Sequence, residues 1–227
     1  YTKALLAAVP SGTPAIRPAE AEQPVALSVA NLNKSYRSKA GMFGAVRTVH
    51  AVKDVSFQIR RGRTLGLVGE SGSGKSTVAR LVTRISDPDS GTIELGGQDY
   101  CALRGEELRR QRSRIQMVFQ DPFSSLNPRR KVGLSIADGP IARGVARSEA
   151  LARARSLLEL VGLDPRSADR LPHEFSGGQR QRIGIARALA LEPDVLVADE
   201  AVSALHVTVQ AQVLKLLDEP KQRLNLA

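Results

Sequence analysis

The sequence predicts an α/β fold in which a phosphate-binding loop joins a buried strand to a helix. The apolar run 64–68 is followed by a glycine-rich loop and then by Lys75, Ser76 and Thr77, which is the spacing of a phosphate loop. A second apolar run, 194–200, ends in two acidic residues, as expected of a buried parallel strand whose tip enters a phosphate site. A mostly helical pattern at about 124–178 predicts a helical subdomain inserted into this α/β core.

The N-terminal 24 residues are expected to lie outside this fold. Residues 1–9 have the pattern of a short helix, and the stretch after them carries prolines at 10, 14, 18 and 24 with little apolar content between them. Such a composition predicts an extended linker, so a domain boundary is expected near residue 24. The 227-residue chain is 42% hydrophobic, which is enough to build a core from the rest.

Composition limits the location and the partners. The chain has a net charge of +10, and its basic residues are scattered over predicted helices. We therefore expect these residues first to form solvated helix faces, second to attract an anionic membrane surface, and third to bind nucleic acid. Aromatic residues make up 4% of the chain, so a stacking surface for single-stranded nucleic acid is not expected. The one cysteine, Cys101, cannot form an internal disulfide and points to a reducing compartment, and no apolar run is long enough to cross a bilayer.

The remaining elements follow from periodicity and turn residues. Apolar alternation predicts strands, a recurrence every three to four residues predicts helices, and the glycines of 37–47 predict a loop or hairpin. Ser148 is the expected N-cap of the clearest helix, and Gly162 follows its end. The expected strands are 25–29, 48–59, 64–68, 92–95, 114–119 and 194–200, and the expected helices are 75–85, 106–112, 148–161, 180–191 and 207–217.

The phosphate loop has a physical reason for each residue type. Glycines allow backbone angles closed to other residues, so that successive N–H groups turn toward a polyphosphate, and the following helix adds its positive dipole end. Lys75 is expected to bind the β- and γ-phosphates, and the Ser76 hydroxyl to hold Mg²⁺. A glycine- and serine-rich surface loop is the alternative. The residues assigned to ATP are Gly69, Ser71, Gly72, Gly74, Lys75, Ser76 and Thr77.

Three further positions complete the predicted chemistry. Asp199, at the tip of the second apolar run, is the natural partner of Ser76 in holding Mg²⁺, and the adjacent Glu200 is placed to act as general base toward the attacking water. Gln120 ends the strand 114–119, where polar residues of open α/β sheets face the ligand crevice; simple strand-end capping is the alternative. Tyr36 is expected either to stack on adenine or to be a half-buried strand residue.

These motifs together resemble one family. The phosphate loop, Gln120, the sequence Ser176-Gly177-Gly178-Gln179 and the pair Asp199-Glu200, in this order around a helical insert, resemble the ATPase domain of ATP-binding cassette (ABC) transporters. The resemblance covers 25–227 and implies a P-loop NTPase (RecA-like) core with an antiparallel β subdomain and an inserted α-helical subdomain. Stretches 117–128 and 172–179 resemble the oligopeptide and dipeptide importer branch.

The resemblance implies a mechanism and partners. ATP and Mg²⁺ would be bound, with Gln120 as a further Mg²⁺ ligand and catalytic residue, and hydrolysis would energise peptide import. A second cassette would bind head to tail, so that Ser176, Gly177, Gly178 and Gln179 of one cassette face the nucleotide of the other. The region of Gln120 and the helical subdomain would pass motion to integral membrane permease subunits, themselves served by an extracytoplasmic solute-binding protein. This places the chain peripherally on the cytoplasmic face of the membrane, without nucleic acid.

Some positions depart from the family pattern. Ala201 and His206 stand where relatives usually carry proline and aspartate, and none of the three histidines has the context of the family's switch histidine, which lies on a strand expected beyond this chain.

Residues 1–10 resemble the tail after a preceding cassette, so the chain is expected to be a weakly active fragment of a two-cassette polypeptide. A nucleic-acid-associated ABC ATPase and a degenerate regulatory cassette are the alternatives, and the transported solute is not indicated.

Overall fold

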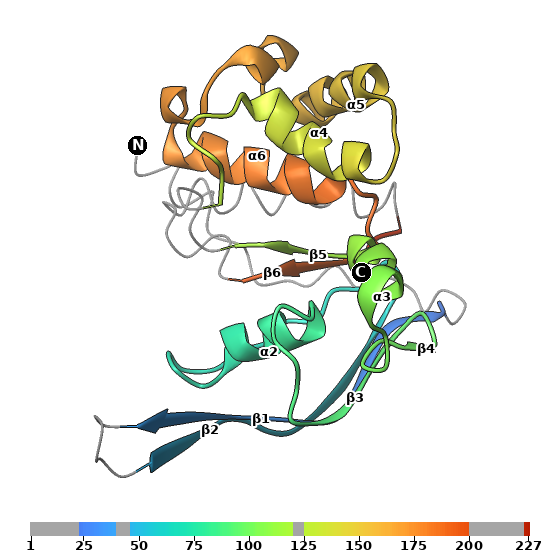
Figure 1. The fold of residues 1–227 in the computed structure, drawn as a ribbon, viewed down its shortest axis with the longest axis vertical. Coiled ribbons are helices and arrows are strands. Elements are labelled where there is room, and N and C mark those ends of the chain that lie inside the picture. The colour runs from blue at the N-terminus through green and yellow to red at the C-terminus, as the bar shows by residue number, and fades with distance from the viewer. Residues whose placement is uncertain (1–22, 40–45, 120–124, 200–224) are drawn as a thin grey trace, which may run out of the picture.

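The computed structural model describes residues 23–39, 46–119, 125–199 and 225–227. Figure 1 shows these residues in layers: a cluster of helices covers a pair of parallel strands, and helix α2 separates that pair from an antiparallel sheet. The strands are β1 (Val25–Lys39), β2 (Val46–Arg60), β3 (Ser90–Leu95), β4 (Gln98–Asp99), β5 (Ile115–Val118) and β6 (Val195–Ala198). The helices are α2 (Lys75–Val82), α3 (Gly105–Gln111), η1 (Arg112–Arg114), α4 (Val132–Ala142), α5 (Arg147–Leu160), η2 (Pro165–Asp169), η3 (Pro172–Glu174) and α6 (Gly177–Leu189).

The antiparallel sheet has the strand order β2-β1-β3-β4. The predicted strands 25–29 and 48–59 are confirmed, and the structure extends both into the region predicted as a loop or hairpin, to Lys39 and from Val46. Asn31 and Asp54 lie at two register shifts between β1 and β2, on either side of the pair Leu32 and Val55. Both have positive φ angles, of 49° and 51°, and Asn31 Nδ2 donates to Asp54 Oδ1 at 2.8 Å. Asparagine and aspartate tolerate this conformation better than most residues, so the bulge is encoded locally.

The parallel pair β5–β6 lies beneath the helices and beside α2. Its register pairs Ile115 with Val195 and Val118 with Ala198, which confirms the two central strands that the sequence predicts. One apolar core joins this pair to α2 and the antiparallel sheet, with Leu27, Leu81 and Ile93 at 1% exposure or less. The sheets and α2 are therefore packed as one body, and the tips of β5 and β6 end beside the start of α2.

A second core holds the helical cluster together. Helices α4, α5 and α6 pack around Ile136, Leu158 and Ile183, each with at most 1% of its surface exposed. The helix predicted at 148–161 is confirmed as α5, but Ser148 is not its N-cap: the helix begins one residue earlier, with Ala146 at the N-cap position and no side-chain cap. Ala150 N donates to Ala146 O at 2.9 Å, so Ser148 already lies inside the first turn.

The strand predicted at 64–68 is wrong, because the structure assigns no strand to these residues. Leu65 and Leu67 remain 44% and 46% exposed. A strand forms only where its backbone can hydrogen-bond to a neighbouring strand. The backbone of β6 is instead bonded to Ala227: Ala227 N donates to Asp194 O at 3.0 Å, and Ala227 O accepts from Leu196 N at 2.9 Å. A groove of about 440 Å³ is lined by Thr64, Leu65 and Leu67 and by β6, so the two segments are not paired.

Two expected helices and most of the expected linker lie outside the described residues. These are the short helix at 1–9, most of the linker after it and the helix at 207–217. The domain boundary near residue 24 therefore stays a prediction. The helix predicted at 75–85 ends sooner, at Val82, because Arg84 adopts a positive φ of 55° that an α-helix does not allow.

Candidate functional site: a phosphate loop beside two strand tips

The phosphate loop is closely packed against the antiparallel sheet. It ends at Gly74, which is the N-cap of α2 and has a φ of 96°. A Cβ atom on Gly74 would lie 2.1 Å from the carbonyl oxygen of Ala51 in β2, whereas a Cβ on Gly72, whose φ is 81°, would meet nothing within 4 Å. Glycine at 74 is therefore required both by the backbone angle and by space, and the sheet fixes the position of the loop.

The side chain of Lys75 returns into the loop that precedes it. Its Nζ donates to the carbonyl oxygens of Gly69 at 2.7 Å and Glu70 at 2.6 Å. Ser73 N also donates to Glu70 O at 3.2 Å, which closes a turn within the loop. The ammonium group is thus held at the inner side of the loop, at the amino end of α2, where the helix dipole also favours an anion.

Ser76 and Asp199 form the polar contact between the loop helix and the second strand tip. Ser76 Oγ donates to Asp199 Oδ1 at 2.8 Å, and Asp199 N donates to Val118 O at 3.1 Å, which anchors the aspartate to β5. A hydroxyl and a carboxylate are the hard oxygen ligands that Mg²⁺ prefers, so the donor set fits this ion. The described residues contain no group of three or more His, Cys, Asp or Glu side chains that could hold a metal. Phosphate and water oxygens would have to complete such a site.

Gln120 and Glu200 lie outside the described residues, so their predicted roles stay predictions. Their positions in the chain are nevertheless informative. Val118 and Ala198 are register partners at the ends of β5 and β6, and Gln120 and Glu200 each follow two residues later. The described ends of these two parallel strands therefore lie at one edge of the sheet, the edge at which Asp199 meets Ser76.

The signature residues form the start of α6. Ser176 is the N-cap: its Oγ accepts from Gln179 N at 3.3 Å, and Ser176 N donates to Gln179 Oε1 at 2.9 Å. This reciprocal pair is a capping box, and it leaves Gly177 and Gly178 without side chains at the helix start. Within the described chain, no hydrogen bond or ion pair joins these four residues to the phosphate loop. Their action on the nucleotide of a second cassette stays a prediction.

The turn before the signature is also held by hydrogen bonds. Leu171 N donates to Glu174 Oε2 at 2.6 Å, and this bond is the largest cause of the lowered pKa of the Glu174 carboxyl, with Arg170 adding to it. The Arg170 guanidinium lies 4.7 Å from the centre of the Phe175 ring, which is itself buried. The segment that leads into α6 is therefore held by the Leu171–Glu174 hydrogen bond and by the contact of Arg170 with the Phe175 ring.

Tyr36 lies on β1 opposite Val49 of β2, within the hairpin that these two strands form. Its exposed fraction is 42%, which leaves both predicted roles open, adenine stacking and a half-buried strand residue. The Lys34 ammonium lies 5.9 Å from the ring centre. The ring is thus accessible, and stacking on adenine stays a prediction.

Sequence reasoning missed the residue that joins the two sheets below the site. Asp194 pairs with Arg61 at the end of β2, at 2.7 Å, and with Arg114 before β5, at 2.6 Å. In the sequence, Asp194 is simply the first residue of the apolar run 194–200. An aspartate at a strand start is common, so no local signal distinguishes one that bridges two arginines from distant elements.

No helix among the described residues has the length and apolar character needed to traverse a bilayer.

Comparison with known proteins identifies the family. The family model described as ABC transporter matches residues 52–203. A relative from Brucella ovis is 51% identical over 201 residues, which are 88% of this chain and 62% of that protein. The dipeptide transport ATP-binding protein of Escherichia coli is 48% identical, covering 91% of this chain and 62% of the relative. The glutathione import ATP-binding protein of Pectobacterium atrosepticum is 49% identical, covering 92% of this chain and 34% of the relative. The chain thus spans about three fifths, or less, of these relatives.

Solved structures agree in fold. A dimeric post-hydrolysis ATP-binding cassette bound to ADP and phosphate superposes with a TM-score of 0.76 at 28% identity, covering 87% of this chain and 83% of the other. A Clostridium perfringens protein described as part of an ABC transporter complex gives a TM-score of 0.75 at 29% identity, covering 90% and 76%. The resemblance drawn from the motifs and the predicted fold class are therefore confirmed. The chain belongs to the ABC transporter family and has the fold of its ATP-binding cassette.

Proposed function

We propose that this chain binds and hydrolyses ATP as the motor subunit of an importer for peptides. The observation that carries the proposal is the contact of Ser76 with Asp199 at 2.8 Å beside the Lys75 ammonium, because it joins the phosphate loop to the tip of β6. Relatives named for dipeptide transport and glutathione import are 48% and 49% identical to the chain, and both of those substrates are peptides.

The chain's own residues would divide the work as follows. Lys75 and the loop amides would hold the β- and γ-phosphates, and Ser76 with Asp199 would hold Mg²⁺, assisted by Gln120. When bound, Mg²⁺ would neutralise charge that develops on the phosphate oxygens. Glu200 would orient the attacking water and accept its proton.

The proposed assembly contains two cassettes and membrane subunits. The capped start of α6 would close over the γ-phosphate of a second cassette, since glycines at a helix N-terminus let backbone N–H groups approach an anion. A related cassette has been solved as a dimer with ADP and phosphate, which supports this arrangement. Integral membrane permeases, fed by an extracytoplasmic solute-binding protein, would be the further partners, with the chain peripheral on the cytoplasmic face.

The test is ATP turnover by the full-length polypeptide, with and without Glu200→Gln, together with nucleotide-dependent dimerisation of both proteins. Turnover that the substitution abolishes, with an ATP-trapped dimer in its place, is the expected result. Nucleotide binding without turnover in either protein would reject the motor function and favour a regulatory cassette, in line with Ala201 and His206. Salt-dependent DNA binding would instead favour the nucleic-acid class.

A further inference from the structure

The turn between α2 and β3 is bonded to β1 at three consecutive residues. Asp89 N donates to Asn33 O at 2.9 Å. The two carboxylate oxygens of Asp89 continue the contact, because Oδ1 accepts from Lys34 Nζ at 2.9 Å and Oδ2 accepts from Ser35 N at 2.7 Å. Asp89 therefore binds one short stretch of β1 through its backbone and its whole side chain, and that stretch leads directly to Tyr36.

These bonds lie where β1 loses one of its two neighbouring strands. The pairing of β1 with β3 ends at Asn33 and Ser90, whereas its pairing with β2 continues to the end of β1. Among the described residues, β1 and β2 beyond Ser35 are therefore a two-stranded ribbon, and such a ribbon is marginally stable by itself. Its direction depends on how its base is held, and Asp89 ties that base to the turn.

Tyr36 is the first residue of this ribbon. Its register partner Val49 is also exposed, so the two side chains form an apolar pair open to solvent. The Lys34 ammonium lies 5.9 Å from the centre of the Tyr36 ring, within the range of a cation–π contact. The same ammonium donates to Asp89 Oδ1 and to Asp87 O, so the turn sets the position of the cation beside the ring.

The same hairpin reaches the phosphate loop. The carbonyl oxygen of Ala51, two residues after Val49 along β2, is packed against Gly74 at the end of the loop. Two residues of a strand span about 7 Å. A ligand held by its phosphates in the loop can therefore extend along β2 toward the Tyr36 ring.

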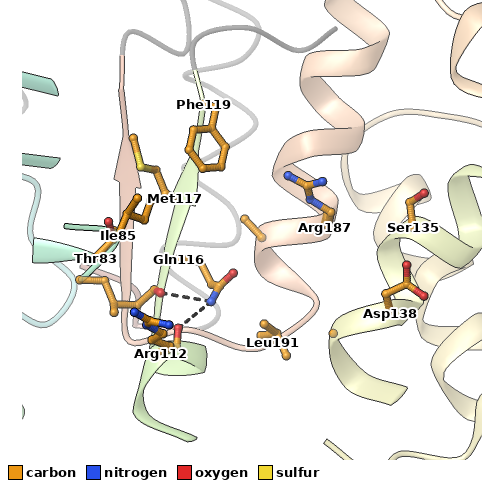
Figure 2. Close-up of a pocket in the computed structure, with 13 residues that line it drawn as sticks. Thr83, Ile85, Arg112, Gln116, Met117, Phe119, Ser135, Asp138, Arg187 and Leu191 are labelled. Carbon is orange, nitrogen blue, oxygen red and sulfur yellow. Dashed lines mark hydrogen bonds between the residues drawn. The ribbon is translucent and has the colours of Figure 1, made fainter. Parts of the chain in front are cut away.

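The turn that carries Asp89 is itself fixed to the rest of the molecule. Arg84 Nε donates to Asp87 Oδ1 at 2.7 Å within the turn. Arg112 Nη2 donates to Arg84 O at 2.6 Å, and Gln116 of β5 in turn donates to Arg112 O at 2.7 Å (Figure 2). The anchor of β1 is therefore joined both to α2, whose first turn closes the phosphate loop, and to β5.

We infer that Asp89 is a positioning residue for the nucleotide base: through Lys34 and the backbone of β1 it holds the Tyr36 ring where an adenine can stack on it. This inference rests on the proposed function, because it takes the ligand to be ATP, and on the predicted stacking by Tyr36. A ring held in advance loses less freedom when the base binds. Removing the anchor should therefore weaken binding of the base and leave binding of the phosphates unchanged.

The test compares two probes on the full-length polypeptide in the presence of Mg²⁺. One probe is ATP, and the other is inorganic tripolyphosphate, which has the phosphates without the base. Isothermal titration calorimetry gives both dissociation constants, and the ratio of the tripolyphosphate Kd to the ATP Kd measures what the base contributes. The variants are Tyr36→Leu, Asp89→Ala, Asp89→Asn and the double variant with Tyr36→Leu and Asp89→Ala.

Asp164→Ala is the matched control. The Asp164 carboxylate also accepts from a backbone N–H and from a guanidinium, both of Arg166, at 2.8 Å and 3.1 Å. Its side chain is 48% exposed, against 46% for Asp89, but it caps η2 in the helical cluster and has no bond to β1. The control therefore removes the same charge and the same kind of contact away from Tyr36.

We expect Tyr36→Leu to lower the ratio about tenfold, since stacking of a base on an aromatic ring has this order of magnitude. Asp89→Ala should lower it about threefold, and Asp89→Asn less, because an acceptor oxygen remains. The control should leave the ratio unchanged. In the double variant the ratio should equal that of Tyr36→Leu alone, because Asp89 acts through the ring. A general effect of the lost charge would instead persist without the ring.

The inference is overturned if Asp89→Ala weakens both probes equally, or if it still lowers the ratio in the Tyr36→Leu background. A ratio that Tyr36→Leu leaves unchanged would overturn it too. If Asp89→Ala does not fold, Asp89→Asn decides by the same criteria, alone and combined with Tyr36→Leu. A wild-type polypeptide that binds neither probe would instead reject the proposed ATP-binding function.

Discussion

Gly74 gives the sharpest test of how the phosphate loop is held. A Cβ atom at this position would lie 2.1 Å from Ala51 O, whereas ordinary contact begins at 3.4 Å, so the loop and β2 must separate by 1.3 Å, the difference between these distances. Ala51 lies in a strand paired along its length with β1, so the loop rather than the strand is expected to move. Gly74→Ala therefore adds a steric conflict to the cost of a left-handed backbone.

The magnitude follows from these two contributions. A left-handed conformation costs a residue with a Cβ about 1–2 kcal/mol, and overpacking against a rigid group adds about 1–3 kcal/mol. Gly74→Ala should thus lower the free energy of unfolding by about 2–5 kcal/mol. Gly72→Ala carries only the first contribution, because its Cβ would have no atom within 4 Å, and Gly66→Ala carries neither.

Urea denaturation of the three variants and the wild type, followed by circular dichroism, measures these differences. Binding of a fluorescent ATP analogue to the same proteins shows whether the displaced loop still holds phosphates. The expected order of destabilisation is Gly74→Ala, then Gly72→Ala, then Gly66→Ala, and the loss of nucleotide affinity should follow it. If Gly74→Ala is no less stable than Gly72→Ala, the packing of the loop against β2 is not what restricts this position.

Three further substitutions test contacts outside the loop. Asp194→Ala leaves two partly buried guanidinium groups without their carboxylate and should lower the free energy of unfolding by about 2–3 kcal/mol in urea denaturation, with Asp194→Asn losing less. Ser176→Ala removes the N-cap of α6 and should cost about 1 kcal/mol, whereas Ser176→Gly should cost only a few tenths. Asp89 has a lowered pKa, chiefly because its carboxylate accepts from Lys34 Nζ, so its ionised form stabilises the fold. Asp89→Asn should therefore be less stable than the wild type at neutral pH, and titration of stability should show this difference fading once the pH falls below the ordinary aspartate pKa; a constant difference down to strongly acidic pH would contradict the assignment.

The parts of the fold that the sequence predicts are those governed by local chemistry. The spacing of Gly69, Gly72, Gly74 and Lys75 predicts the loop and the start of α2, and the apolar run that ends in two acidic residues predicts β6, whose tip the structure places beside Ser76. These predictions succeed because backbone angles, dipoles and strand direction are set within a few residues. The predicted N-cap of α5 is wrong for a local reason too, because the helix starts at Ala146 without a hydrogen bond from a capping side chain.

The features that the sequence does not predict depend on partners far along the chain. Segment 64–68 has the composition of a strand, yet a strand exists only where another backbone pairs with it, and no strand among the described residues does so there. Asp194 is a similar case. Its role depends on arginines 61 and 114, which lie on other elements far along the chain.

The two carbonyl bonds of Lys75 have a consequence for how tightly a nucleotide can be bound. A free lysine side chain loses about 2 kcal/mol of rotamer entropy when it is fixed. Because Lys75 Nζ is already anchored to Gly69 O and Glu70 O, most of that loss belongs to folding rather than to ligand capture. The same two hydrogen bonds also hold the phosphate loop together, because the ammonium group joins two of its carbonyl oxygens. Replacing Lys75 by methionine would therefore remove a charge and also let the loop relax, so the resulting loss of affinity measures preorganisation and electrostatics together.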